Sequence, residues 1–210
     1  MSRTTRGVVL SLCDLTGNMV KPWAEDGYEC WCLDIQHEPG EQKHDGILWI
    51  GEDIRTWKTP SVKYACVFAF PPCTHLAVSG ARWWVGKGLR LLSESIELVA
   101  RCAEICEEAE APWMIENPVG SLSSYWRKPD AKFDPCDYAG YLNNRDTDAY
   151  TKKTCLWTGS GFNVPLPRPV FPILGSKMHM LPPSSDRARL RSETPMGFSR
   201  AVFEANRKEL

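Results

Sequence analysis

The sequence predicts an α/β fold in which a mostly parallel, Rossmann-like sheet carries helices on both faces. Three observations lead to this expectation. Short apolar segments of strand length alternate along the chain with helical segments. Polar or acidic side chains follow several of the apolar segments directly, as they do at the ligand-binding edge of open parallel sheets. Two of the apolar segments also stop at prolines, which cannot donate a hydrogen bond to a sheet.

The composition is that of an ordinary globular protein. The chain has 210 residues, 43% of them hydrophobic and 24% charged, which suffices for one domain with a proper core. No apolar run approaches the length that crosses a bilayer, so we expect a soluble, cytoplasmic protein with no membrane partner. The net charge of −1 gives no global attraction to nucleic acid, so any such contact must come from local basic patches.

The nine cysteines show neither a CxxC pair nor a Cys/His grouping at zinc spacing, so we expect no metal site. Cys30 and Cys32 would face the same side of one strand, and Cys102 and Cys106 lie one helical turn apart. Both pairs are better explained as core-filling thiols in a reducing compartment than as disulfides.

The first unit of the chain has the pattern strand, tight turn, helix. Apolar residues from Gly7 to Leu12 predict the strand, Cys13–Asn18 the turn, and Met19–Asp26 a short helical segment. Such a unit opens nucleotide-binding α/β sheets, where the backbone N–H groups of the turn face a ligand. Because the GxGxxG spacing is absent, an ordinary strand-to-helix turn is an equal alternative.

Acidic residues follow the next two apolar segments. Asp34 follows the predicted strand Glu29–Leu33, and Asp53 lies in the connection after the third segment. Each acid alone is typical of a helix cap or a turn. Together with Asp14 after the first strand, they favour one shared nucleoside-like ligand. In that interpretation Asp34 accepts from ribose hydroxyls and Ile54 packs on an adenine ring.

The segment Tyr64–Thr74 organises the chain. An apolar run from Ala65 to Phe70 predicts a buried strand, which Pro71 and Pro72 terminate. Cys73 then stands at the carboxyl end of that strand. A lone cysteine is most often a small buried hydrophobe, but the stiff double proline at a strand end favours a nucleophile.

A loop and an amphipathic helix follow the central strand. Residues 74–88 contain several glycines and tryptophans, and we expect this loop to act as a lid. Apolar residues then recur at three- and four-residue steps from Leu89 to Cys106, which predicts a crossover helix packed on the sheet. The next strand, Pro112–Ile115, ends in Glu116-Asn117-Pro118.

The remainder of the chain is expected to be largely irregular. Residues 120–150 are rich in loop signals, Lys152–Trp157 predicts a strand entered by basic residues, and residues 156–193 are rich in proline. A final helix is predicted over Ser199–Arg207. Because no repeat or separate linker is found, we expect one domain over residues 1–210.

The two proline-terminated strands suggest a chemistry. A right-handed parallel crossover would bring Cys73 and Glu116 to the same edge of the sheet. A thiolate and a carboxylic acid suit addition to an activated planar ring, where the sulfur attacks carbon and the acid stabilises the ring nitrogen that gains electron density. The alternative is a nucleotide-binding structural domain in which Cys73 is buried and unreactive.

Pro71-Pro72-Cys73 and Glu116-Asn117-Pro118 resemble the catalytic signatures of the S-adenosylmethionine-dependent cytosine-5 DNA methyltransferases. The resemblance continues, in the linear order of the family, through Asp14–Gly17, Asp34, Gly51–Ile54 and the C-terminal segment around Gly197. It implies a methyltransferase sheet of the Rossmann-like class, S-adenosylmethionine as the cofactor, and cytosine in DNA as the substrate.

The resemblance also implies roles for individual residues. Cys73 would add to C6 of cytosine and Glu116 would stabilise the protonated N3, after which C5 takes the methyl group. Asn117 would help to fix the Pro-Pro-Cys loop. Cofactor contacts are implied for Asp14, Leu15, Thr16, Gly17, Asp34, Ile35, Asp53, Ile54 and Pro71. Substrate contacts are implied for Pro72, Thr74, Arg82, Asn117, Pro118, Lys152 and Lys153, although the last two and Arg82 could equally be solvated surface charges.

The sequence departs from the family pattern in several places. Met19 stands where the cofactor turn usually has a second glycine, Pro118 stands where valine is common, and the motif rich in glutamine and arginine is represented at best by Lys152-Lys153. Residues 156–193 are too few for an independent target-recognition domain. We therefore expect low or very short sequence selectivity, or selectivity supplied by an accessory subunit.

Two other functions fit the same sequence features. One is a related C5-pyrimidine modification of RNA or of a free nucleotide. The other is a catalytically silent nucleic-acid-binding accessory protein, against which the presence of both Cys73 and Glu116 argues.

Overall fold

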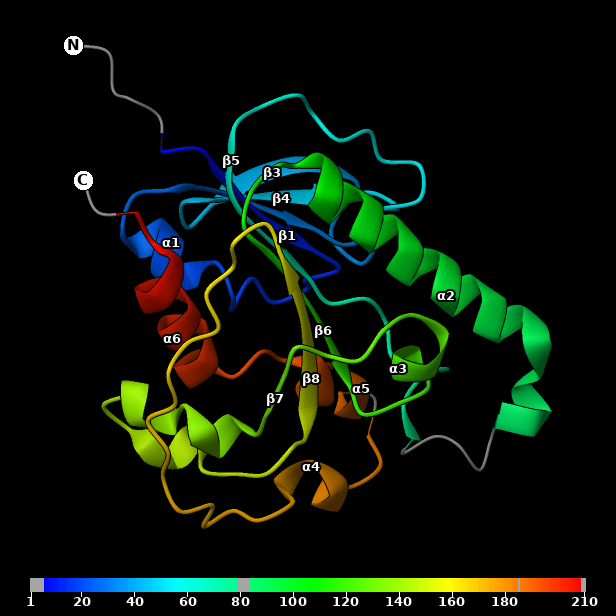
Figure 1. Ribbon diagram of the computed structural model, residues 1–210, viewed down its shortest axis with the longest axis vertical. Helices are drawn as coiled ribbons and strands as arrows, with labels where there is room; N and C mark the ends of the chain where they lie inside the picture. Colours follow the sequence, from blue (N-terminus) through cyan, green and yellow to red (C-terminus); the bar gives the residue numbers. More distant parts are fainter. Residues whose placement is uncertain (1–5, 79–83, 185, 209–210) are drawn as a thin grey trace.

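One sheet runs through the centre of the protein (Figure 1). The computed structural model describes residues 6–78, 84–184 and 186–208. Within these residues the sheet has eight strands in the order β3-β4-β2-β1-β5-β6-β8-β7. The strands are β1 (Val8–Leu12), β2 (Glu29–Leu33), β3 (Gly40–His44), β4 (Ile47–Gly51), β5 (Tyr64–Ala69), β6 (Trp113–Pro118), β7 (Ala131–Phe133) and β8 (Thr154–Gly159).

Five neighbouring strands are parallel, and the strands at both edges are antiparallel. β1 pairs in parallel with both β2 and β5, β2 pairs with β4, and β5 pairs with β6. The order of the strands along the chain reverses at β1, which is the point where open α/β sheets form a ligand crevice. β3, β7 and β8 pair antiparallel with their neighbours. The predicted Rossmann-like α/β class is thereby confirmed.

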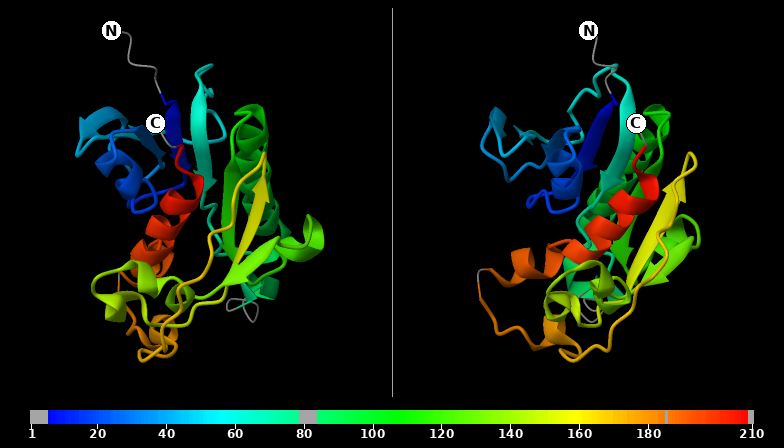
Figure 2. Two further views of the ribbon diagram at one scale, coloured as in Figure 1. Left: turned by 60° about the vertical axis from the view of Figure 1, so that its left-hand side comes forward. Right: turned by 90° about the vertical axis from the view of Figure 1, so that its left-hand side faces the viewer.

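Helices cover both faces of this sheet. They are α1 (Lys21–Glu25), α2 (Trp84–Glu108), α3 (Leu122–Tyr125), α4 (Lys177–Met180), α5 (Arg187–Ser192) and α6 (Met196–Asn206), with short 3-10 helices η2 (Pro135–Asp137), η3 (Ala139–Tyr141) and η4 (Arg145–Asp148). Figure 2 shows α2 and α6 on opposite sides of β5. Among the described residues, no helix is long and apolar enough to cross a membrane.

Strand alternation divides the core into two clusters. Successive side chains of β1 and β5 point to opposite faces, so each strand contributes to both clusters. The cluster beneath α2 includes Leu10, Leu12, Val67, Ile105 and Cys106. The cluster beneath α1 and α6 includes Val9, Phe68, Met114, Trp23 and Phe198. All five parallel strands are therefore fixed from both sides, and their carboxyl ends form a stable platform.

The structure differs from the sequence-based expectation in several elements. The strand β3, which is exposed along its length, was not expected because it carries no apolar residue. Helix α2 begins at Trp84, inside the predicted lid, and contains a non-helical Gly88 (φ 74°). Residues 79–83 of that lid lie outside the described residues. The predicted loop 120–150 contains β7 and three 3-10 helices, and α6 begins three residues before the predicted Ser199.

Candidate functional site

Cys73 lies at the carboxyl end of the central strand β5. Phe70 makes the last backbone contact of this strand, donating to the Leu12 carbonyl at 2.9 Å, and the two prolines that follow have no N–H group. The Cys73 carbonyl then accepts from Leu76 (3.0 Å) and Ala77 (2.9 Å), which forms one tight turn. Seven of the nine cysteines are buried, whereas Cys73 and Cys13 are only half-buried. The Cys73 thiol therefore differs from the core-filling thiols.

Asn117 joins the end of β6 to the Pro-Pro-Cys segment. Its Nδ2 donates to the Pro71 carbonyl at 2.9 Å, and the side chain is 1% exposed. This is the contact that the resemblance implies for Asn117. Because Pro71 has no N–H group and its carbonyl is held by a buried amide, the backbone that carries Cys73 is fixed relative to the strand that carries Glu116.

The charge of Glu116 acts on the Cys73 thiol. Burial raises the pKa of the Cys73 thiol, and the Glu116 carboxylate raises it further, while Lys152 and Arg191 oppose this rise. Burial also raises the pKa of Glu116, against the lowering effects of Lys152 and of a hydrogen bond from Thr154. A thiolate at residue 73 is consequently favoured when Glu116 is protonated.

Glu116 lines a narrow pocket between β6 and the C-terminal elements. The pocket has a volume of about 10 Å³, which is the space of about one water-sized sphere. Its wall is aromatic on one side and polar on the other. The lining residues are Phe70, Glu116, Phe133, Lys152, Thr154, Ser192, Glu193, Thr194, Pro195 and Phe198. A group larger than a water molecule enters only if this wall opens. Residues 192–195, from the end of α5 to the start of α6, and Phe198 of α6 belong to the part of the wall outside the sheet.

The two adjacent lysines have different surroundings. Lys152 is half-buried and lines the Glu116 pocket. Lys153 is exposed and pairs with Asp134, which raises the pKa of its ammonium group. Of the two, Lys152 belongs to the pocket, whereas Lys153 belongs to the outer surface.

The first turn after β1 is organised by Asp14. This side chain is 4% exposed and accepts from the Ser11 hydroxyl (2.8 Å) and from the backbone N–H groups of Thr16 (3.1 Å) and Gly17 (2.8 Å). The N–H of Asn18 lies 3.3 Å from the Thr16 hydroxyl oxygen. The expectation that these N–H groups face a ligand is therefore wrong for residues 16–18. Asp14 acts by shaping the turn, because its own oxygens are used inside it.

Gly17 allows this turn to approach strand β4 closely. It has a positive φ of 63°, and a β-carbon on it would lie 2.7 Å from Cη2 of Trp49. The Trp49 ring in turn packs edge-on against His37 at 5.1 Å and is stacked with His44 at 5.1 Å. The turn and the aromatic cluster thus form one packed unit beside the end of β2.

We expect Gly17→Ala to destabilise the protein by about 2–4 kcal/mol, since left-handed strain and overlap with Trp49 add together. Gly27→Ala is the matched control, because Gly27 also has a positive φ (83°) but nothing within 4 Å of its β-carbon position. The control should lose only about 1–2 kcal/mol. Urea unfolding of both variants measures the difference, and equal losses would show that the contact with Trp49 has no effect.

The remaining proposed cofactor residues lie beyond β2 and β4. Asp34 is 8% exposed and accepts from the Gln36 N–H at 2.8 Å, and the neighbouring Ile35 is 65% exposed. Asp53 forms an ion pair with Arg55, which lowers the pKa of its carboxyl group. Ile54 is 5% exposed and belongs to the core beneath α2. Ile35, rather than Ile54, is thus the aliphatic side chain accessible to a planar ring.

The other proposed substrate residues surround Cys73 and Glu116 in sequence. Pro72 and Thr74 are exposed, Pro118 is half-buried at the end of β6, and Pro71 is buried. Arg82 lies outside the described residues.

Sequence reasoning missed several residues of the site. Phe70, Phe133 and Phe198 form the aromatic wall of the Glu116 pocket. Phe70 directly precedes Pro71, so its position at the strand end was a local signal. Phe133 and Phe198 come from β7 and α6, and their rings stack at 4.1 Å. Their contribution depends on packing between distant segments, which no local pattern reveals.

Comparison with known proteins finds similar solved structures but no matching family model. No protein-family model matches the chain, and no curated protein matches it. Among solved structures, the chain is partly similar to the glycopeptide N-methyltransferase MtfA, with 14% identity, a TM-score of 0.31, and coverage of 60% of this chain and 52% of that one. For MtfA complexed with (S)-adenosyl-L-methionine, the identity is 13% and the TM-score is 0.30, and the match covers 74% of this chain and 65% of that one. The chain thus spans between half and two thirds of the length of these structures.

Proposed function

We propose that the protein is a methyltransferase that transfers a methyl group from S-adenosylmethionine to C5 of cytosine in DNA. The observation that carries the proposal is the placement of Cys73 and Glu116 after two neighbouring parallel strands. The Glu116 carboxylate raises the pKa of Cys73, and Lys152 lowers the pKa of both groups. The hydrogen bond from Asn117 to Pro71 supports it, because it fixes the two strand ends relative to one another.

The side chains at the end of β5 and β6 suit covalent activation of the ring. The Cys73 thiol loses its proton to solvent, and the thiolate forms a bond to C6 while the C5–C6 π electrons move to make C5 nucleophilic. The protonated Glu116 donates to N3, which gains electron density in this step. After C5 has been alkylated, a base removes the C5 proton. The C6–S bond then breaks, its electrons return to sulfur, the C5–C6 double bond re-forms, and the N3 proton returns to Glu116.

The first turn and the end of β2 fit a nucleoside cofactor. Asp34 retains acceptor capacity beside an exposed Ile35. Thr16, Gly17, Asp34 and Ile35 would hold S-adenosylmethionine. When bound, this cofactor supplies an electrophilic methyl group.

Transfer of a radioactive methyl group tests the proposal. The protein is incubated with labelled S-adenosylmethionine and, in separate reactions, with DNA, RNA or dCTP. We expect label in DNA, recovered as 5-methylcytosine after digestion. Label in RNA or dCTP alone would favour the related pyrimidine modification, and absence of label from all three would favour a silent binding protein.

A further inference from the structure

We propose that a single strand of DNA binds along the outer edge of the sheet formed by β7 and β8. Its phosphates would lie on Lys128, Lys132 and Lys153, and one base would stack on Trp126. The inference rests on the proposed function and adds the form of the substrate and its path across the surface.

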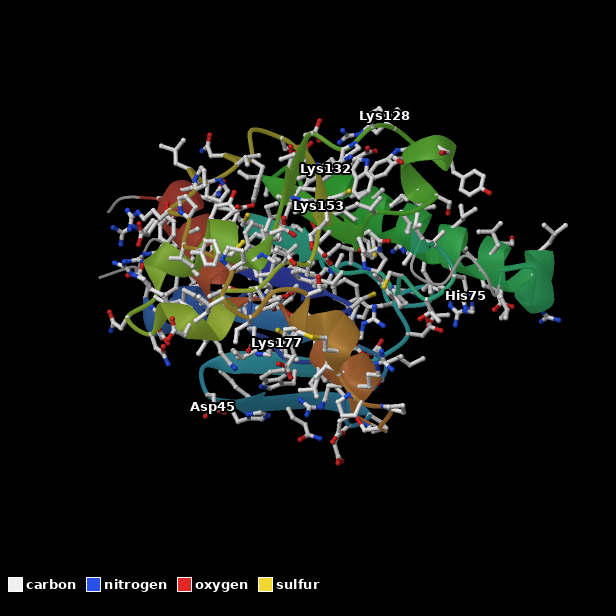
Figure 3. The ribbon with its side chains drawn as sticks, turned by 90° about the horizontal axis from the view of Figure 1, so that it is seen from below. Asp45, His75, Lys128, Lys132, Lys153 and Lys177 are labelled. Carbon is white, nitrogen blue, oxygen red and sulfur yellow. The ribbon has the colours of Figure 1, made fainter. Side chains whose placement is uncertain are left out.

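The register of β7 and β8 places the lysines on one face. Lys132 is paired with Cys155, and Lys153 lies two residues before Cys155. Since side chains alternate along a strand, Lys132, Lys153 and Trp157 share a face. Figure 3 shows Lys128, Lys132 and Lys153 following one another beside these strands, with Lys177 further away near α4. The stretch from Lys153 to Trp157 spans about 13 Å, which is enough for a few nucleotides.

Two of these lysines carry charge that no acid neutralises. Arg127 pairs with Asp130 at 2.8 Å, and Lys153 pairs with Asp134. Within residues 6–78, 84–184 and 186–208, no ion pair involves Lys128 or Lys132, and both are exposed. On a protein of net charge −1 this local excess of positive charge is a feature of this edge, and phosphates are the groups that it fits.

A rigid aromatic surface lies next to the lysines. The ring of Trp126 is 36% exposed and stacks at 6.0 Å on Trp157, which is 1% exposed. Trp157 Nε1 donates to the Arg127 carbonyl at 2.7 Å, and the Arg127 guanidinium lies 5.0 Å from the Trp126 ring centre. The neighbouring Tyr125 is 57% exposed. Aromatic rings beside a basic track are the arrangement that binds single strands through base stacking.

The region that stands in place of a recognition domain leaves this track open. The backbone of residues 168–175 is hydrogen-bonded to residues 139–151, as in the contacts Gly140 to Arg168 and Leu174 to Ala149, both 2.9 Å. It is therefore held against the protein rather than forming an independent second wall. A duplex held from one side would still have to extrude its cytosine at a cost of a few kcal/mol, whereas an unpaired base is already free.

The track also leads to the candidate catalytic residues. Lys152, the residue next to Lys153, lines the pocket of Glu116. Because side chains alternate, Lys152 points to the opposite face from Lys153. A strand that follows the lysines would therefore cross the segment before β8 to bring a nucleotide to the pocket, and Lys152 would be the first cation that it meets there.

Fluorescence anisotropy of labelled DNA at several salt concentrations tests the inference. The probes are a 20-nucleotide single strand and its duplex. We expect the wild type to bind the single strand more tightly. In the double variant Lys128→Ala/Lys132→Ala, the slope of log affinity against log salt should decrease in magnitude by about 1.4, which corresponds to two lost phosphate contacts on a single strand. Trp126→Leu should weaken binding by about 5- to 150-fold, and Trp126→Phe, which retains a ring, by much less.

The control is Lys43→Ala/Lys63→Ala, which removes two exposed lysines away from β7 and β8. It should leave the slope unchanged, and thermal unfolding verifies that every variant is folded. An unchanged slope in the Lys128/Lys132 variant, or tighter binding of the duplex, would overturn the inference. Covalent capture of DNA by Cys73 is measured separately. If capture occurs but the salt slope of the Lys128/Lys132 variant is unchanged, only the proposed DNA path along β7 and β8 is refuted. If binding depends on the lysines but neither capture nor methyl transfer occurs, the proposed function is refuted.

Discussion

Replacing Cys73 by serine is expected to abolish covalent capture of DNA that contains 5-fluorocytosine. Fluorine at C5 cannot leave as a proton does, so the adduct between sulfur and C6 accumulates in the wild type in the presence of S-adenosylmethionine. A serine hydroxyl is nearly the same size but ionises far less readily, and removal of a nucleophile typically lowers turnover by at least about a thousandfold. The measurement is an adduct that survives denaturing electrophoresis, together with the rate of methyl transfer.

Cys13→Ser is the matched control for this experiment. Cys13 is the other half-buried cysteine and also follows a strand of the parallel sheet, but it lies after β1. We expect this variant to form the adduct. Persistence of the adduct in the Cys73→Ser variant would remove Cys73 from the mechanism.

Glu116→Gln is expected to lower kcat/KM by about 10²–10⁴-fold, because the amide cannot exchange a proton with N3. The same change should lower the pKa of Cys73, since the Glu116 carboxylate raises it in the wild type. Alkylation of Cys73 by iodoacetamide should then begin at lower pH. The variant should be at least as stable as the wild type at neutral pH, because burial disfavours the ionised form of Glu116.

The pH profile separates a catalytic role from a structural one. In the reactive form Glu116 is protonated and Cys73 is deprotonated. The wild type should therefore show a bell-shaped dependence of kcat/KM on pH. Since the pKa values of Glu116 and Cys73 are both raised, the acid and alkaline limbs of this profile should lie at higher pH than the ordinary pKa values of a glutamate and a cysteine. In Glu116→Gln the alkaline fall should disappear and only a rise through the pKa of Cys73 should remain.

Glu193→Gln is the control for charge in the pocket. Glu193 also lines the pocket but pairs with Arg189 at 2.7 Å. We expect it to keep the bell-shaped profile. An unaltered rate and profile in Glu116→Gln, or an equal loss in Glu193→Gln, would contradict the role given to Glu116.

The parts of the site that are encoded locally could be predicted from the sequence. Two prolines force β5 to end before Cys73, and an apolar run followed by Glu116-Asn117 defines the end of β6. A parallel crossover through α2 then brings these ends to one edge. The internal bonding of the first turn was not predicted, because its N–H groups were expected to face a ligand, whereas those of Thr16 and Gly17 donate to Asp14.

Other parts depend on contacts between distant segments. An apolar side chain such as Ile54 could contact either a ligand or the core. Only the packing of the folded chain shows that it lies in the core beneath α2. Strand β3 is held by its ladder with β4 rather than by apolar side chains, so no periodicity reveals it. The pocket wall combines β6, β7, β8 and the start of α6, and its narrow width is a property of their assembly.

The position of α6 determines when the pocket of Glu116 is complete. Its Phe203 ring packs on Trp23 of α1 at 5.2 Å, and the Asn18 side chain reaches the Thr194 carbonyl at 3.3 Å. A chain that has folded only as far as β8 already contains Cys73 and Glu116, but it lacks residues 192–195 and Phe198, which line one part of the Glu116 pocket.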